Sequence, residues 1–167
     1  MRLHSMLDSI NLFVHNALIG SSRELPPMFD LRDAENNSTI VVTPFIGETD
    51  EEVNRNKDFT AFLVRKKIIE HKITHYLYLS EGWAIIRNRD QYKPGISTTP
   101  SNSADRIEVV ISFATDGATY LSSSWEIKRN GPVCIALIPR EIKLERPPDT
   151  HKGRFDNLLR TDDKHPS

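Results

Sequence analysis

The sequence predicts an α+β fold in which two helices pack on a mostly antiparallel sheet of about six strands. Three observations support this prediction. Residues 105–139 are predicted as three consecutive antiparallel strands separated by two turns that contain Gly, and apolar residues alternate with others in the first two strands. Two other stretches show helical spacing, and β-branched runs lie between them. At 167 residues the chain is long enough to bury a core without disulfides or metals.

The N-terminal stretch predicts an amphipathic helix over residues 3–19, which Gly20 ends. A linker follows and closes with Pro26-Pro27. Two alternatives are open for the apolar face of this helix: it packs on the sheet, or it lies on a second copy of the chain or on another protein.

A hairpin and a second helix come next. A short strand over Met28–Arg32 turns into the β-branched run Thr39–Thr43. Thr49 and Glu52 form a capping box, which predicts a helix to about Lys72. The residues expected on the inner side of this helix are large and apolar: Phe59, Phe62, Leu63 and Ile69.

Residues Ile73–Ile86 are the next predicted strand, with a break or bulge at Gly82. We expect both helices to cover one face of the sheet. If the connection from Thr39–Thr43 through the second helix is a parallel crossover, the sheet is mixed rather than wholly antiparallel.

The register of the first hairpin of the 105–139 meander can be predicted from its side chains. A two-residue turn at Asp116-Gly117 would place Ile111 opposite Ser122, whereas a three-residue loop with Gly117 in the left-handed conformation places Ile111 opposite Leu121. Because the second register pairs apolar residues, it is the one predicted. The last strand, Val133–Ile138, is apolar on both faces, so we expect it inside the sheet or under a second layer.

The chain divides into three parts: a helix and linker (1–24), an α+β core domain (25–139) and a charged C-terminal tail (140–167). Residues 89–103 are rich in Ser, Thr and Pro and predict a long polar loop. In the tail, after the break at Pro147-Pro148, Phe155, Leu158 and Leu159 are the apolar anchors expected to dock on the domain or on a partner.

Composition limits the classes of function. A formal net charge of −1 gives no general attraction to nucleic acid or membranes, and no apolar run approaches the roughly 20 residues of a membrane span. The N-terminus does not resemble a signal peptide, and Cys134 is the single cysteine, so we expect a cytoplasmic protein. His71 and His75 have helical spacing but no third ligand nearby, and neither a metal nor another cofactor is predicted.

Catalytic motifs are missing: the sequence has no Gly-rich phosphate loop, nucleophile elbow or zinc-protease pair. The most suggestive polar residue is Glu81, in the otherwise apolar stretch 76–86. Burial there would raise the pKa of its carboxyl toward the range of a general acid or base, with Ser80 and Trp83 beside it as binding residues. The alternative is a carboxylate that faces solvent or pairs with Arg87.

Two further clusters have alternative interpretations. Ser122-Ser123-Ser124 could line a shallow site, or Ser122 and Ser124 could face solvent while Ser123 fills the core. Binding residues of a basic patch would be Arg65, Lys66, Lys67 and Arg87, with Tyr76 and Tyr78 stacking bases of a nucleic acid. In the alternative the cations complement the dipole of the second helix and the tyrosines pack beneath it.

The first functional hypothesis is a non-enzymatic binding or assembly module, with a protein partner or a second copy of the chain as its ligand. The second is a small, hydrolytic enzyme that uses Glu81 as general acid or base. The third is binding of RNA or single-stranded DNA through the basic patch.

Overall fold

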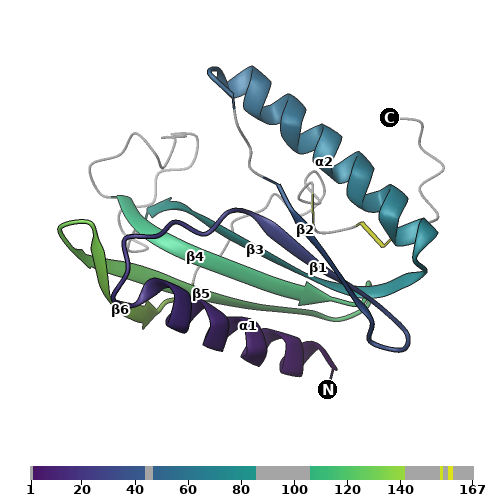
Figure 1. Ribbon diagram of the computed structural model, residues 1–167, viewed down its shortest axis with the longest axis horizontal. Helices are drawn as coiled ribbons and strands as arrows, with labels where there is room; N and C mark the ends of the chain where they lie inside the picture. Colours follow the sequence, from purple (N-terminus) through teal and green to yellow (C-terminus); the bar gives the residue numbers. More distant parts are fainter. Residues whose placement is uncertain (1, 44–46, 86–105, 142–154, 156–157, 160–167) are drawn as a thin grey trace, which may run out of the picture.

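The computed structural model describes residues 2–43, 47–85, 106–141, 155 and 158–159 (Figure 1). Six strands form one open sheet in the order β2-β1-β3-β4-β5-β6, and each pair of neighbours is antiparallel. The α+β fold and its terminal meander are therefore confirmed. The elements are α1 (Arg2–Leu18), β1 (Met28–Asp33), β2 (Ser38–Val42), α2 (Asp50–Glu70), β3 (Ile73–Ile85), β4 (Arg106–Thr115), β5 (Tyr120–Asn130) and β6 (Val133–Pro139).

The two helices cover opposite faces of the sheet, and the expectation that they share one face is wrong (Figure 1). Successive strand residues point to opposite faces. In β3, Leu77 and Leu79 belong to the core under α1, whereas Tyr76 belongs to the core under α2. β4 is divided in the same way, with Val110 on the α1 side and Phe113 on the α2 side. The central strands are apolar on both faces because each face has its own helix.

The apolar face of α1 is buried against the sheet, so the alternative in which it contacts a partner is wrong. Leu3, Met6, Val14 and Leu18 are all buried in the core that α1 shares with β3, β4, β5 and β6. A polar contact fixes the helix as well. Asn11 Oδ1 accepts hydrogen bonds from Ser123 Oγ at 2.8 Å and from Trp125 Nε1 at 3.2 Å.

α2 begins as the sequence predicts but is rotated differently. Its N-cap Thr49 accepts a hydrogen bond from the Glu52 N–H at 3.1 Å, and the Glu52 carboxylate accepts one from the Glu48 N–H at 2.8 Å. The side chains predicted to face inward are exposed, and those on the other side of the helix are buried instead: Thr60, Ala61, Val64 and Ile68. Aromatic rings of the sheet and of the C-terminal segment belong to the same core beneath α2.

Both registers considered for the β4–β5 hairpin are wrong. Thr115 pairs with Tyr120 across a four-residue loop, so Ala114 lies opposite Leu121 and Ile111 opposite Ser124. The Asp116 carboxylate holds this loop by accepting hydrogen bonds from the next two N–H groups beyond Gly117. Gly117 has the expected positive φ, at 90°. The prediction failed because it assumed a single apolar face on β4.

Two strand expectations also need correction. β6 is an edge strand rather than an inner one, and its Ile135 side chain is exposed. The segment after α1 pairs with this edge: the Gly20 N–H donates to the Cys134 carbonyl, and the Cys134 N–H donates to the Ser21 carbonyl. There is no bulge at Gly82, because the β3–β4 register runs unbroken along both strands.

The anchors of the tail dock on the domain, as one of the two alternatives predicts. Phe155 and Leu158 are buried in the α2-side core, and the Tyr76 hydroxyl donates a hydrogen bond to the Phe155 carbonyl. The predicted loop 89–103 and the break at 147–148 lie outside the described residues. Within the described part of the chain, neither helix has the length and apolar character needed to cross a bilayer.

Candidate functional site

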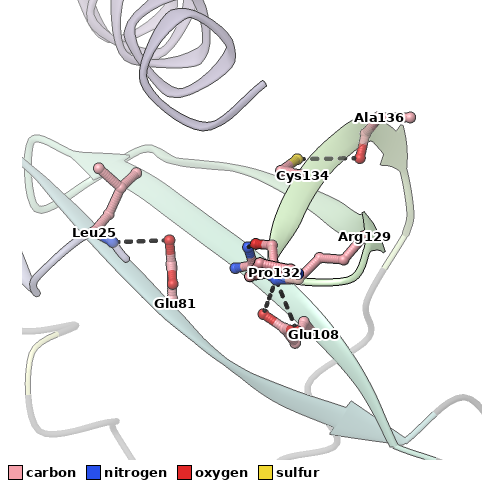
Figure 2. Close-up of polar contacts among 7 residues, drawn as sticks. All are labelled: Leu25, Glu81, Glu108, Arg129, Pro132, Cys134 and Ala136. Carbon is pink, nitrogen blue, oxygen red and sulfur yellow. Dashed lines mark hydrogen bonds and ion pairs between the residues drawn. The ribbon is translucent and has the colours of Figure 1, made fainter. Parts of the chain in front are cut away.

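Glu81 lies on the α1 face of β3 and is half-buried, between the buried and the solvent-facing positions that the sequence left open. Its Oε1 accepts a hydrogen bond from the backbone N–H of Leu25 at 2.9 Å (Figure 2). Burial raises the pKa of the Glu81 carboxyl; the Leu25 N–H and the charge of Arg129 oppose the rise, while Glu24 and Glu108 add to it. The carboxyl therefore holds its proton more tightly than an ordinary glutamate.

Arg129, on β5, supplies the positive charge near Glu81 but is itself held by other groups. Its Nε donates to both carboxylate oxygens of Glu108 at 3.0 Å, and its Nη1 donates to the Pro132 carbonyl at 2.8 Å (Figure 2). This ion pair joins β4 to β5. Because Glu108 neutralises the guanidinium, Glu81 is not held as a fully paired carboxylate.

Cys134, on β6, is the single cysteine of the chain. Its environment disfavours the thiolate, which is the reactive form of a cysteine. The side chain is buried, and its Sγ lies 3.6 Å from the Ala136 carbonyl oxygen (Figure 2). Burial raises the pKa of the thiol. A nucleophilic cysteine needs a lowered pKa and access to solvent, so Cys134 acts as a small core residue.

The residues predicted to accompany Glu81 do not all join it. Ser80 projects from the opposite face of β3, and its hydroxyl donates to the Glu81 carbonyl at 3.1 Å. Trp83 is on the Glu81 face and partly exposed, with the Arg106 guanidinium 4.2 Å from its ring centroid in a cation–π contact. Arg87 lies outside the described residues. Glu81 and Trp83 thus place a carboxylic acid and an aromatic surface on the same face of β3.

The proposed basic patch does not include stacking tyrosines. Arg65 and Lys66 are exposed on α2, and Lys67 is half-buried. Tyr76 is fully buried and Tyr78 is packed among Phe29, Phe113 and Phe155, so the alternative in which the tyrosines lie beneath the helix is confirmed.

The remaining sequence candidates take structural positions. His71 follows α2 as its exposed C-cap, whereas His75 is buried in β3. In the described ranges no three His, Cys, Asp or Glu residues are grouped as a metal site. Ser123 faces α1, and its hydroxyl forms a hydrogen bond with Ser112 Oγ at 2.8 Å. Ser122 is exposed on the other face, as the solvent-face alternative predicts, whereas Ser123 and Ser124 are half-buried.

The most prominent unexplained surface is on α2. We call it the α2 stripe: the outward side chains Phe59, Phe62, Leu63 and Ile69, which are 60%, 63%, 36% and 71% exposed. Residues three, four and seven positions apart share one side of a helix, so Phe59, Phe62 and Leu63 are neighbours on this side, and Ile69 lies beyond the exposed Lys66. Helical spacing did single out these residues. It could not indicate that they face outward, because Ala61, Val64 and Ile68 show a second spacing of the same kind on the other side.

Comparisons of the chain with protein-family models, with curated proteins and with solved structures find no match.

Proposed function

We propose that this protein is a non-enzymatic binding or assembly module whose contact surface is the α2 stripe. The single observation that carries the proposal is the exposure of two phenylalanines, a leucine and an isoleucine along one side of one helix. Isolated apolar side chains are common on protein surfaces, but a contiguous patch of large ones is characteristic of interaction sites.

The chemistry of the stripe supports a protein as the ligand. Aromatic residues are enriched at the centres of protein interfaces, where they supply much of the binding energy. Phe59, Phe62 and Leu63 are adjacent on one helix, and exposed charged side chains, Lys66 among them, lie beside them. An apolar centre with a charged rim is the usual arrangement of a helix that binds in a groove or against another helix.

A photo-crosslinking amino acid at position 62 tests this proposal, with position 12 as the control. Leu12 is exposed to nearly the same degree as Phe62, 65% against 63%, but lies on α1. The full-length chain would be irradiated alone and in extract of its own cells. We expect a discrete protein adduct from position 62 and not from position 12. Equal labelling from both positions, or none from position 62, would refute the proposal.

A second candidate function rests on Glu81. The raised pKa of its carboxyl and the neighbouring Trp83 support a small enzyme in which Glu81 is general acid or base. Glu81→Gln keeps an oxygen that can accept the Leu25 hydrogen bond but removes the titration. Under this hypothesis the variant folds normally and loses the activity; a variant with unchanged biological function ends the catalytic hypothesis.

A further inference from the structure

We propose that the outward side of α2 binds the same side of α2 in a second copy of the chain, with the two helices antiparallel about a two-fold axis near Phe59. Phe59, Phe62 and Leu63 of both copies then lie at the centre of the contact. This inference rests on the proposed function and names the partner of the same surface. It is carried by the distribution of charge along α2.

The two ends of α2 and its flanks carry opposite and equal charge. Over residues 48–58, five carboxylates and two bases leave a net charge of −3. Over residues 65–72, four bases and one carboxylate leave a net charge of +3, with His71 neutral. The apolar block Phe59–Leu63 lies between them. A second α2 in the antiparallel direction places each negative end beside a positive end, whereas a parallel one places like charges together.

Single positions on the exposed side show the same symmetry. Glu52, Phe59 and Lys66 are seven residues apart, so they lie on one line along the helix, and all three are exposed. A two-fold axis near Phe59 therefore brings Glu52 of one copy opposite Lys66 of the other, twice in each dimer. Two ion pairs near these ends are long and within the helix, Glu51–Arg55 at 3.7 Å and Lys66–Glu70 at 4.0 Å. Such exposed pairs contribute little and can rearrange at low cost.

The dipole of an isolated helix also favours acidic residues at its start and basic ones at its end. That preference explains the sign of the charges but not the exposed apolar block at their centre. Antiparallel pairing satisfies both features, because it aligns opposite helix dipoles as well as opposite side-chain charges.

The size of the contact sets the expected affinity. α2 has 21 residues and is about 31 Å long. One helix side on each copy is a contact near or below the roughly 1,200 Å² at which stable interfaces begin. We therefore expect a weak, reversible dimer that forms in the micromolar range.

Sedimentation of the full-length chain from about 1 μM to about 500 μM tests for this dimer. We expect the average mass to rise toward that of two chains. Phe62→Glu should raise the dissociation constant about tenfold or more, as for an aromatic residue at the centre of an interface. Leu12→Glu, at an equally exposed position on α1, should leave it unchanged. A wild-type chain that stays monomeric over the whole range overturns the inference, as does an equal effect of the two variants.

Disulfide trapping tests the orientation. The native Cys134 is buried, so an added surface cysteine reacts without competition from it. In the antiparallel dimer, Glu52→Cys and Lys66→Cys should form a disulfide when mixed, and neither variant should form one alone. Identical positions are then about 21 Å apart along the helix axis, far beyond the reach of a disulfide. Thermal unfolding of each reduced variant checks that it is folded. Rapid 52–52 and 66–66 disulfides would show parallel pairing and overturn the inference.

The outcomes for this inference and for the proposed function are distinct. If position 62 forms adducts only with a different protein while the chain stays monomeric, the second-copy inference fails and the binding module stands. If position 62 forms no specific adduct at all, both fail.

Discussion

Two adjacent isoleucines near the end of α2 test how this helix is rotated on the sheet. Ile68 is 5% exposed and packs in the α2-side core, whereas Ile69 is 71% exposed on the α2 stripe. The residues are identical and neighbouring, so Ile68→Ala and Ile69→Ala remove the same atoms from the same turn of helix. They differ in the surroundings of those atoms.

The expected losses of unfolding free energy follow from the exposure. Each substitution removes three carbons, at about 0.8 kcal/mol for each fully buried carbon. Ile68→Ala therefore loses about 2.4 kcal/mol of transfer free energy plus a cavity contribution, which gives about 2–4 kcal/mol in total. Ile69 is already 71% exposed, so Ile69→Ala loses less than a third of this transfer free energy, about 0.7 kcal/mol. The higher helix propensity of Ala offsets about 0.4 kcal/mol of it.

Urea unfolding of both variants and the wild type provides the measurement, at about 1 μM protein so that self-association does not add to stability. A loss for Ile69→Ala as large as that for Ile68→Ala would refute the rotation of α2 described here. The stripe would then be the inner face, as the hydrophobic pattern predicted. A small loss for Ile69→Ala means that the chain tolerates removal of this side chain, and that its apolar character serves something other than folding.

Substitutions at Gly117, Asn11 and His75 test other parts of the fold. Gly117→Ala should cost about 1 kcal/mol because φ is +90°, whereas Gly82→Ala, with an unstrained φ and nothing within 4 Å of an added Cβ, should be neutral or stabilising by thermal unfolding. Asn11→Leu should cost about 1–3 kcal/mol because it leaves the Trp125 Nε1–H without its acceptor, while the Asp variant keeps one; calorimetry that shows equal stabilities would contradict this role. Burial lowers the pKa of His75 below 6.5, so the unfolded chain binds the proton more tightly and stability should fall as the pH drops below about 6.5. In His75→Gln that pH dependence, followed by urea titrations, should disappear.

The sequence predicted which residues form strands and helices much better than it predicted what covers them. Local signals set the elements: the Thr49 cap starts α2, and Gly117 marks the β4–β5 turn. The registers and buried faces depend on layers that are far away in the chain. β4 has apolar residues on both faces because α1 lies on one and α2 and Phe155 on the other. The sequence of β4 alone does not show which of its two sets of apolar residues, one on each face, lies opposite Leu121.

The site shows the same limit in its chemistry. The apolar neighbours of Glu81 left two alternatives open, a buried carboxyl and one that faces solvent or pairs with Arg87. The structure shows the side chain half-buried and the pKa of its carboxyl raised. Its hydrogen-bond partner could not be predicted, because the Leu25 N–H is 56 residues away and is a backbone group that no side-chain pattern marks. The pairing of Arg129 with Glu108 is equally invisible, since it depends on the β4–β5 register that local reasoning missed.

α2 shows why exposure carries more information about function here than apolar character does. A surface helix that only packs on a sheet needs one apolar side and is more soluble with a polar one opposite. α2 has Val64 and Ile68 inside and Phe59 and Phe62 outside, so its composition exceeds what packing requires. An exposed aromatic pair promotes aggregation unless a specific contact covers it. The opposite charges at the two ends of α2 would disfavour a parallel contact with a second α2, since parallel helices place like charges together. A sequence that needed only a fold would have no reason to combine these two features.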